Sequence, residues 1–187
     1  EGFVGVNINY RLAPQHVWPS GIDDLTALTD WLEANIAGYG GDPGSVVLWG
    51  HSAGAAHVAD YLAHAATSGR EPKVAGAVLT SGFYDLGDEV SVWQAYYGDD
   101  VSTYDERSSL PGLLRSDVPL LVTDAELDPE NFRVEAEKLT TARAEAGKPV
   151  RRVHLPNHSH LSETYAVGTD DRSLSEPVAA FVRDVVQ

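Results

Sequence analysis

The chain has 187 residues, of which 43% are hydrophobic and 22% charged, a composition typical of a globular protein with one sizeable core. Its 28 acidic residues against 13 Lys and Arg give a formal charge of −15, which repels phosphate backbones and anionic membranes and argues against a nucleic acid partner. The lack of cysteine excludes disulfides, thiol catalysis and thiolate metal sites, and no run approaches the ~20 apolar residues of a membrane span.

Five short runs rich in β-branched or apolar residues predict strands, at residues 3–9, 45–49, 74–80, 119–123 and 150–155. Longer helical patterns separate them, and this alternation is typical of a mostly parallel sheet with helices on both faces. The middle three runs are nearly continuous in apolar residues, as expected for parallel strands that are covered on both sides. The sequence therefore predicts an α/β fold in one domain, residues 1–187.

Four helices are predicted between and after these strands. The first follows Pro19, with Ser20 as the expected N-cap, and ends at a glycine-rich turn at residues 38–43. The others are expected from the residue after Ser52 to about 66, from 129 or 130 to 146, and over 175–186. Residues 82–118 are longer than a plain connection needs, and we expect them to form a cap or pocket insertion.

The chemistry is concentrated at residues 45–54, which read as a strand, then Gly-His-Ser-Ala-Gly, then a helix. In this context G-x-S-x-G predicts a nucleophile elbow that presents Ser52 above the sheet at a helix N-terminus. Gly50 and Gly54 are expected to relieve crowding around the strained serine, and the Ala53 N–H to face a developing oxyanion. The alternative is a plain glycine turn with a solvated serine.

A serine nucleophile needs a base and an acid that orients it, and in this fold they follow later strands in the order Ser, Asp, His. Asp128 comes after the predicted strand 119–123 and just before Pro129, which would begin a helix. The alternative role for Asp128 is a simple helix N-cap. Asp124 and Glu126 are acidic competitors that lie closer to the strand end.

Two histidines compete for the role of base in the loop after the last strand. We favour His160, because Leu161 and a possible N-cap at Ser162 would anchor it at the start of a helix; His158 is the alternate base.

A metal site is a further alternative for this loop. His158 and His160 have the spacing of two ligands on one strand face, with His154 and Glu163 nearby. Because they follow Pro156, where the strand should end, we favour no metal. Three further histidines are interpreted as the variable residue of the elbow and two ordinary polar positions on the following helix: His51, His57 and His64.

With these motifs in hand, the chain resembles the α/β-hydrolase superfamily, and within it the esterases related to hormone-sensitive lipase and the carboxylesterase and kynurenine-formamidase group. The matching segments, in the family's order, are residues 9–14, 39–43, 50–54, 125–129 and 157–160. The resemblance places the nucleophile on Ser52, the acid on Asp128 and the base on the histidine of the last loop. It also implies a small-molecule ester substrate and no cofactor.

One departure concerns the start of the chain. Such enzymes carry a His-Gly-Gly loop upstream of the tyrosine-arginine motif, and its N–H groups help to bind the oxyanion. This loop and the strand before it are absent, so we expect the N-terminal strands to be missing here and to be supplied by a further segment or a second chain. Because losing one oxyanion donor typically costs roughly 10²–10³ in rate, the chain alone is expected to be nearly inactive.

The leading hypothesis is thus a serine hydrolase that cleaves carboxylic esters through an acyl-enzyme on Ser52. An amidase or arylformamidase with the same triad is the alternative among enzymes, and a non-catalytic ligand-binding module is the alternative outside them. Arg11 is expected to be a buried or half-buried ion-pair partner. A cytoplasmic location is expected, with the lack of cysteine equally compatible with secretion. Candidate pocket residues are the aromatic side chains of the insertion: Phe83, Tyr84, Trp93, Tyr96 and Tyr97.

Overall fold

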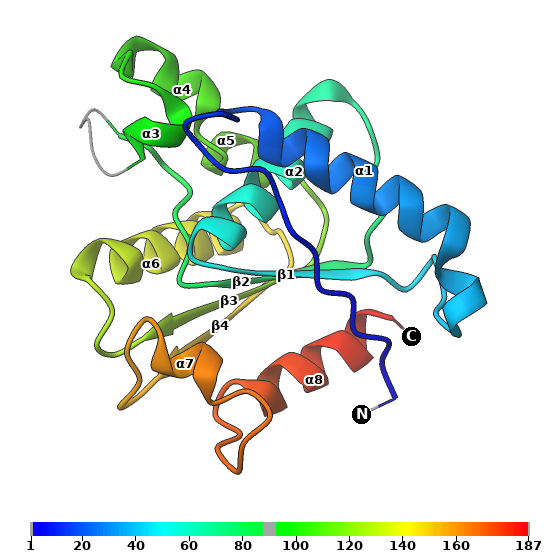
Figure 1. Ribbon diagram of the computed structural model, residues 1–187. Helices are drawn as coiled ribbons and strands as arrows, with labels where there is room; N and C mark the ends of the chain where they lie inside the picture. Colours follow the sequence, from blue (N-terminus) through cyan, green and yellow to red (C-terminus); the bar gives the residue numbers. More distant parts are fainter. Residues whose placement is uncertain (1, 88–92, 187) are drawn as a thin grey trace.

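The computed structural model describes residues 2–87 and 93–186, and its centre is a parallel four-stranded sheet. The strands follow one another in sequence order: β1 (Val47–His51), β2 (Gly76–Thr80), β3 (Leu120–Ala125) and β4 (Val150–Leu155). Figure 1 shows this sheet nearly edge-on. The predicted α/β class and four of the five predicted strands are confirmed, with boundaries that shift by up to two residues.

The register of the sheet brings the loops that follow its strands to one edge. His51 pairs with Thr80, Thr80 with Thr123, and Asp124 with His154, so all four strands end at nearly the same level. In parallel sheets this carboxyl edge is where functional side chains converge. Asp124, which the sequence placed after the strand, is the last residue but one of β3.

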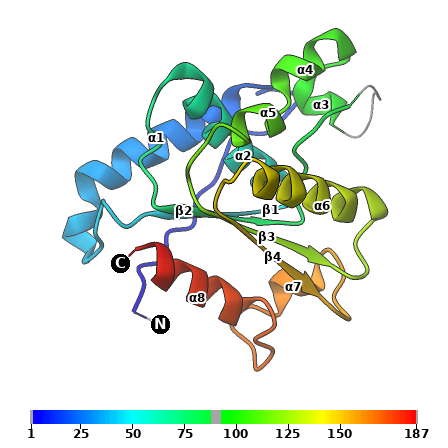
Figure 2. The same cartoon turned by 180° about the vertical axis from the view of Figure 1, so that it is seen from behind.

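Helices cover both faces of the sheet, as Figures 1 and 2 show. On one face lie α1 (Ser20–Asn35), α2 (Ala53–Ser68) and α6 (Glu130–Glu145), and on the other lies α8 (Ser175–Val185). The larger core lies under the first three helices, and its fully buried side chains include Leu62, Leu79, Leu113, Leu120 and Leu139. The smaller core, under α8, includes Val78, Leu121, Leu155, Leu174 and Phe181.

The predicted start of the first helix needs a correction. Ser20 is already the first residue of α1, the N-cap position is Pro19, and no side chain caps the helix there. The N–H of Gly21 instead donates to the phenol oxygen of Tyr96 at 2.9 Å. A side chain from 75 residues further along therefore satisfies one of the N–H groups in the first turn that have no acceptor within the helix. The expectations for α2, α6 and α8 are confirmed.

The remaining helical elements are short: η1 (Ile36–Tyr39), α3 (Gln94–Tyr97), η2 (Val101–Thr103), α4 (Tyr104–Arg107), α5 (Leu110–Leu113) and α7 (Ser162–Tyr165). Four of them belong to the insertion at 82–118, of which residues 88–92 lie outside the described part. The insertion has an apolar cluster of its own, formed by Leu86, Tyr97 and Tyr104. Tyr84, by contrast, is buried in the larger core.

The strand predicted at residues 3–9 is wrong, because these residues form no strand in the structure. A strand exists only when a neighbour supplies backbone partners, and β1, at the edge of the described sheet, is hydrogen-bonded to β2 alone. The segment runs instead from α8, where Arg183 stacks on Phe3, to the larger core, where Ile8 packs. Phe3, Val4 and Val6 remain exposed.

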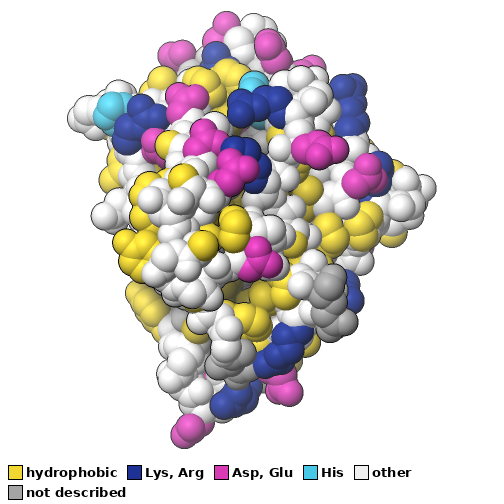
Figure 3. Space-filling view, turned by 90° about the vertical axis from the view of Figure 1, so that its right-hand side faces the viewer, with side chains coloured by type: hydrophobic (Ala, Val, Ile, Leu, Met, Phe, Trp, Pro, Cys, Tyr) yellow, Lys and Arg dark blue, Asp and Glu magenta, His cyan; other side chains and the backbone are white. Residues whose placement is uncertain are grey.

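The surface is strongly acidic but not of one sign throughout. Figure 3 shows a face on which acidic and basic side chains are interspersed, with hydrophobic side chains reaching the surface between them. Arg11 pairs with Asp24, with 2.7 Å between Nε and Oδ1, which confirms the expected ion pair; its side chain is 43% exposed and therefore not fully buried. Among the described residues no helix combines the length and the apolar character needed to cross a bilayer.

Candidate active site

Ser52 lies at a sharp turn between β1 and α2. Its backbone has φ 54° and ψ −119°, a conformation that non-glycine residues rarely adopt and that the surrounding structure must enforce. A Cβ at Gly50 would come within 2.3 Å of the carbonyl oxygen of Gly54, so the turn requires glycine at position 50. A Cβ at Gly54 would meet nothing within 4 Å, so the expectation that both glycines relieve crowding is wrong for Gly54.

The structure brings Ser52, His160 and Asp128 into one chain of hydrogen bonds. Nε2 of His160 lies 2.8 Å from Oγ of Ser52, and its Nδ1 lies 2.9 Å from Oδ1 of Asp128. An ionised carboxylate can only accept, so the proton of the neutral imidazole is on Nδ1 and Nε2 is left as an acceptor for the Ser52 hydroxyl. This is the geometry that a general base for a serine nucleophile needs.

Asp128 is held by more than the histidine. Its side chain is completely buried, and Oδ2 accepts hydrogen bonds from Oγ of Ser81 at 2.6 Å and from the N–H of Ala125 at 2.8 Å. The N-cap of α6 is Pro129, with no side-chain cap, so the alternative role of Asp128 as an N-cap is wrong. Phe132, from the first turn of α6, packs against the imidazole of His160, with 4.6 Å between the two ring centroids.

Contacts between the loops after β3 and β4 explain why Asp128 meets His160. The N–H of Leu127 donates to the carbonyl of His158 at 2.9 Å, and the N–H of Asn157 donates to Glu126 at 2.6 Å. Glu126, one of the acidic competitors, thus binds the backbone of the neighbouring loop. Asp124, the other, is buried against Arg152 and His154 of β4.

The alternate base, His158, is turned away from the nucleophile. Its Nε2 lies 2.8 Å from Oγ of Ser173 and 3.2 Å from Asp171, and its Nδ1 lies 3.3 Å from Oγ of Ser162. These contacts fasten the loop to the segment before α8. They use both ring nitrogens of His158 and leave the contact with Ser52 to His160.

Ala53 is the first residue of α2, and its N–H therefore has no acceptor within the helix. Ala53 also borders a cavity of about 270 Å³, which lies between the segment before α1, the start of α2 and the insertion. Among the aromatic residues proposed for a pocket, Trp93, Tyr96 and Tyr97 line this cavity. Phe83 packs on Trp93 instead.

The interpretation of His57 as an ordinary polar position is wrong. Its imidazole is buried between the rings of Tyr10 and Tyr96, at centroid distances of 4.8 and 4.7 Å, and it borders the same cavity. Burial lowers the pKa of His57 below its usual value, which keeps the ring neutral. His64, almost two helical turns further along α2, is exposed as expected.

The donor cluster found in the structure differs from the one that the sequence suggested for a metal ion. Within the described ranges, the only cluster compatible with a metal ion is His51, His160 and Glu163, which includes neither His154 nor His158. Both ring nitrogens of His160 are already engaged, by Asp128 and by Ser52. A cation on this imidazole would have to break the hydrogen-bond chain.

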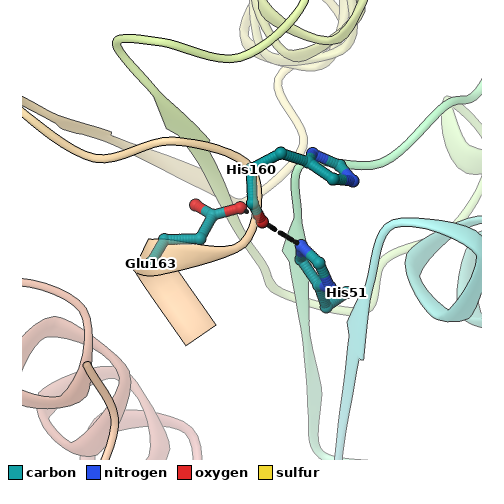
Figure 4. Close-up of side chains that lie close together, drawn as sticks. All are labelled: His51, His160 and Glu163. Atoms are coloured by element: carbon teal, nitrogen blue, oxygen red, sulfur yellow. Dashed lines mark hydrogen bonds and ion pairs between the residues drawn. The ribbon is translucent and has the colours of Figure 1, made fainter. Parts of the chain in front are cut away.

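Three residues near the site were given no catalytic role from the sequence, although Glu163 was weighed as a metal ligand and His51 as part of the elbow: Ser81, His51 and Glu163. Ser81 follows β2 and, like Ser52, has a positive φ, of 46°. Its place at the end of a parallel strand was a usable signal, because the neighbouring strand ends carry the other site residues. His51 and Glu163 face the backbone of His160, and Figure 4 shows the three together.

The comparisons with known proteins agree with this architecture. Residues 2–163 match the family model described as "alpha/beta hydrolase fold". The chain belongs to the α/β-hydrolase fold family. The resemblance drawn from the sequence motifs is thereby confirmed.

Curated relatives of this α/β-hydrolase chain include Esterase LipQ from Mycobacterium tuberculosis, which is 29% identical over 97% of the chain and 48% of its own length. Carboxylesterase NlhH of the same species is 49% identical over a 49-residue stretch, 26% of the chain and 15% of its own length. The chain thus spans about half the length of LipQ.

Among solved structures, a Pyrobaculum calidifontis esterase has a TM-score of 0.73 and 23% identity, covering 95% of the chain and 63% of the esterase. The thermostable carboxylesterase EstE1, cloned from a metagenomic library, has a TM-score of 0.78 and 23% identity. The match covers 96% of the chain and 68% of EstE1. At these identities the likeness shows the fold.

Proposed function

We propose that this protein is a serine hydrolase that cleaves carboxylic esters through an acyl-enzyme on Ser52. The observation that carries the proposal is the unbroken hydrogen-bond chain from Ser52 through His160 to the buried Asp128, built on a strained turn. The names of the relatives, esterase and carboxylesterase, point to the same chemistry.

In the first half of the reaction, Nε2 of His160 takes the hydroxyl proton of Ser52 while Oγ bonds to the ester carbonyl carbon. The carbonyl π electrons move onto its oxygen, and the Ala53 N–H stabilises this oxyanion. Collapse of the intermediate breaks the bond to the alcohol, which leaves with the proton from His160. In the second half, water gives its proton to His160 and attacks the acyl group, and the acid is released as Ser52 regains its proton.

Asp128 contributes orientation and charge. It keeps the proton of the neutral imidazole on Nδ1, and it stabilises the imidazolium that forms when Ser52 attacks. Its remaining oxygen is fixed by Ser81 and Ala125, so the carboxylate needs no reorganisation during the reaction.

We also propose that the insertion at 82–118 contributes to the substrate pocket. Trp93, Tyr96 and Tyr97 border the cavity beside Ala53, where the oxyanion would form. Its volume of about 270 Å³ and its aromatic walls suit a small ester better than a long polar chain.

The test is covalent labelling of the full-length protein with a fluorophosphonate, followed by peptide mapping and by hydrolysis of p-nitrophenyl esters of increasing acyl length. We expect one adduct, on Ser52, and ester hydrolysis that disappears in Ser52→Ala. Ester hydrolysis without an adduct on Ser52 would contradict the proposal. Bound ester that is never hydrolysed would favour a ligand-binding module. Faster turnover of N-formyl arylamines than of matched esters would favour the formamidase alternative.

A further inference from the structure

Glu163 is a buried carboxylate that the proposed catalytic chain does not use. It lies in the short helix α7, its side chain has no exposed area, and neither carboxylate oxygen makes a hydrogen bond within the described part of the chain. Burying an unpaired charge is costly, so a carboxylate retained in this position needs a partner. The imidazole of His51 lies beside it, with 3.4 Å between Nε2 of His51 and Oε1 of Glu163.

His51 in turn contacts the backbone of the candidate base. Its Nε2 lies 2.7 Å from the carbonyl oxygen of His160, shorter than its separation from Glu163. A carbonyl oxygen can only accept, so Nε2 of His51 must carry a proton. Figure 4 shows His51 and Glu163 both directed at the backbone of His160, whose ring points away from Glu163.

The position of His51 in the chain connects this contact to the nucleophile. His51 immediately precedes Ser52, so it fixes the backbone of the base relative to the backbone of the nucleophile. His160 itself lies in a loop between β4 and α7, without a strand or helix to hold it. Proton transfer tolerates little displacement, and a misplacement of about 1 Å can cost ~10²-fold in rate.

We propose, on the basis of the proposed function, that His51 and Glu163 are positioning residues for His160. Glu163 holds the imidazole of His51 in place, and His51 clamps the carbonyl of His160 at the distance that proton transfer from Ser52 requires. The arrangement differs from that of Asp128 and His160, in which two different ring nitrogens are engaged: Glu163 and the carbonyl of His160 both face Nε2 of His51, and the contact acts on the main chain instead of on the nucleophile.

The test compares variants at position 51 in the full-length protein. A Gln side chain places its amide N–H₂ close to where the Nε2–H of the histidine lies, whereas Asn is too short to reach the carbonyl. We expect His51→Gln to keep kcat for a p-nitrophenyl ester within about 5-fold of the wild type and His51→Asn to lower it by about 10- to 100-fold. KM should change by less than about 3-fold in both, since the clamp does not touch the substrate. The rate of Ser52 phosphonylation should fall in parallel with kcat.

Variants at position 163 test the second half of the proposal. Glu163→Gln removes the charge at almost constant volume, and we expect about a 10-fold lower kcat with KM unchanged. The double variant His51→Asn/Glu163→Gln should be no slower than His51→Asn alone, because Glu163 acts through His51. His64→Gln and Glu176→Gln, at exposed positions on α2 and α8, are the matched controls and should behave like the wild type.

Circular dichroism and thermal unfolding establish that each variant is folded. Equal kcat for His51→Gln and His51→Asn would overturn the clamp, as would a loss confined to KM or fully additive effects of the two substitutions. A wild-type protein that is not labelled on Ser52 would instead refute the proposed function, so the two failures are distinguishable.

Discussion

Two Asp–His pairs with buried carboxylates lie at the carboxyl edge of this sheet, and only one of them reaches Ser52. Asp128 contacts Nδ1 of His160 at 2.9 Å, and Asp124 contacts Nδ1 of His154 at 2.7 Å. Both carboxylates have completely buried side chains. By these measures the pairs are almost the same.

The third partner and the backbone distinguish them. Asp124 and His154 lie inside paired strands, and Arg152 supplies a cation to Asp124 at 2.8 Å, while the ring of His154 is half-exposed. Asp128 and His160 lie in the loops beyond the strands, and Asp128 is held by a serine and an N–H. An Asp–His contact is therefore not by itself a catalytic feature; what decides is whether the free ring nitrogen faces a nucleophile.

The sharpest test of this comparison is Asp128→Asn. The amide oxygen can still accept from Ser81 and Ala125, so we expect the free energy of unfolding to change by less than about 1 kcal/mol. The amide would favour the wrong tautomer of His160, so kcat/KM for ester hydrolysis should fall by roughly 10³–10⁴. Steady-state kinetics and urea unfolding measure the two quantities, and a loss below 10-fold would remove Asp128 from the mechanism.

Asp60 extends the comparison to a buried aspartate for which the described part of the chain supplies no cation or histidine partner. Its carboxyl accepts one hydrogen bond, from Tyr97 at 2.8 Å, and burial raises its pKa to about 8. The folded protein therefore binds a proton that the unfolded chain, with an ordinary pKa near 4, has released. The contribution of this proton to the free energy of unfolding is fully present below pH 4. It should be lost as the pH rises from 4 through 8, at up to about 1.4 kcal/mol per pH unit. Urea unfolding at pH 5, 6 and 7 measures the free energy of unfolding. We expect its slope against pH to be more negative in the wild type than in Asp60→Asn, by about 1.4 kcal/mol per pH unit, which corresponds to one proton. Parallel plots of the free energy of unfolding against pH for the two proteins would contradict this.

The reciprocal prediction concerns the pair that does not reach Ser52. Asp124→Asn leaves Arg152 without its buried anion, and we expect a loss of about 2 kcal/mol in the free energy of unfolding. Because Asp124 makes no contact with Ser52 or His160, kcat/KM should stay within about 3-fold of the wild type. A rate loss as large as that of Asp128→Asn would mean that the two pairs cannot be told apart by geometry.

The smallest expected effect tests the support of Asp128. Ser81→Ala removes one of the two hydrogen bonds to Oδ2, and we expect kcat/KM to fall by about 10-fold with KM nearly unchanged. Ser109→Ala is the matched control, since Ser109 is equally buried but bonds the carbonyl of Tyr84 in the insertion. Equal rates for the two variants would show that Ala125 alone suffices to hold the carboxylate.

The parts of the molecule that sequence reasoning predicted well are those that local pattern encodes. Apolar runs gave β1 to β4, and the positions of Ser52, Asp128 and His160 after successive strands were enough to predict that they meet. In a parallel sheet, being at a strand end already implies being at the same edge.

What sequence reasoning missed depends on partners distant in the chain. Residues 3–9 have the composition of a strand, but composition provides no neighbour for the backbone to pair with. The contacts of Ser81 with Asp128 and of His51 with Glu163 join residues 47 and 112 positions apart, and no spacing rule connects them. His57 looked polar on its helix, and only the packing of Tyr10 and Tyr96 around it reveals a buried ring.

The strands lie in the sheet in the same order as in the sequence, so the site can form only after the last strand has been added. Ser52 and the elbow are complete once β1 and α2 have formed, but His160 comes 108 residues later, after the last strand. Under the proposed function, a chain still emerging from the ribosome would present Ser52 without His160, and we expect hydrolysis to begin only when β4 docks beside β3. The appearance of activity during synthesis or refolding would thus report closure of a contact between residues 108 positions apart, a step with a large cost in loop entropy.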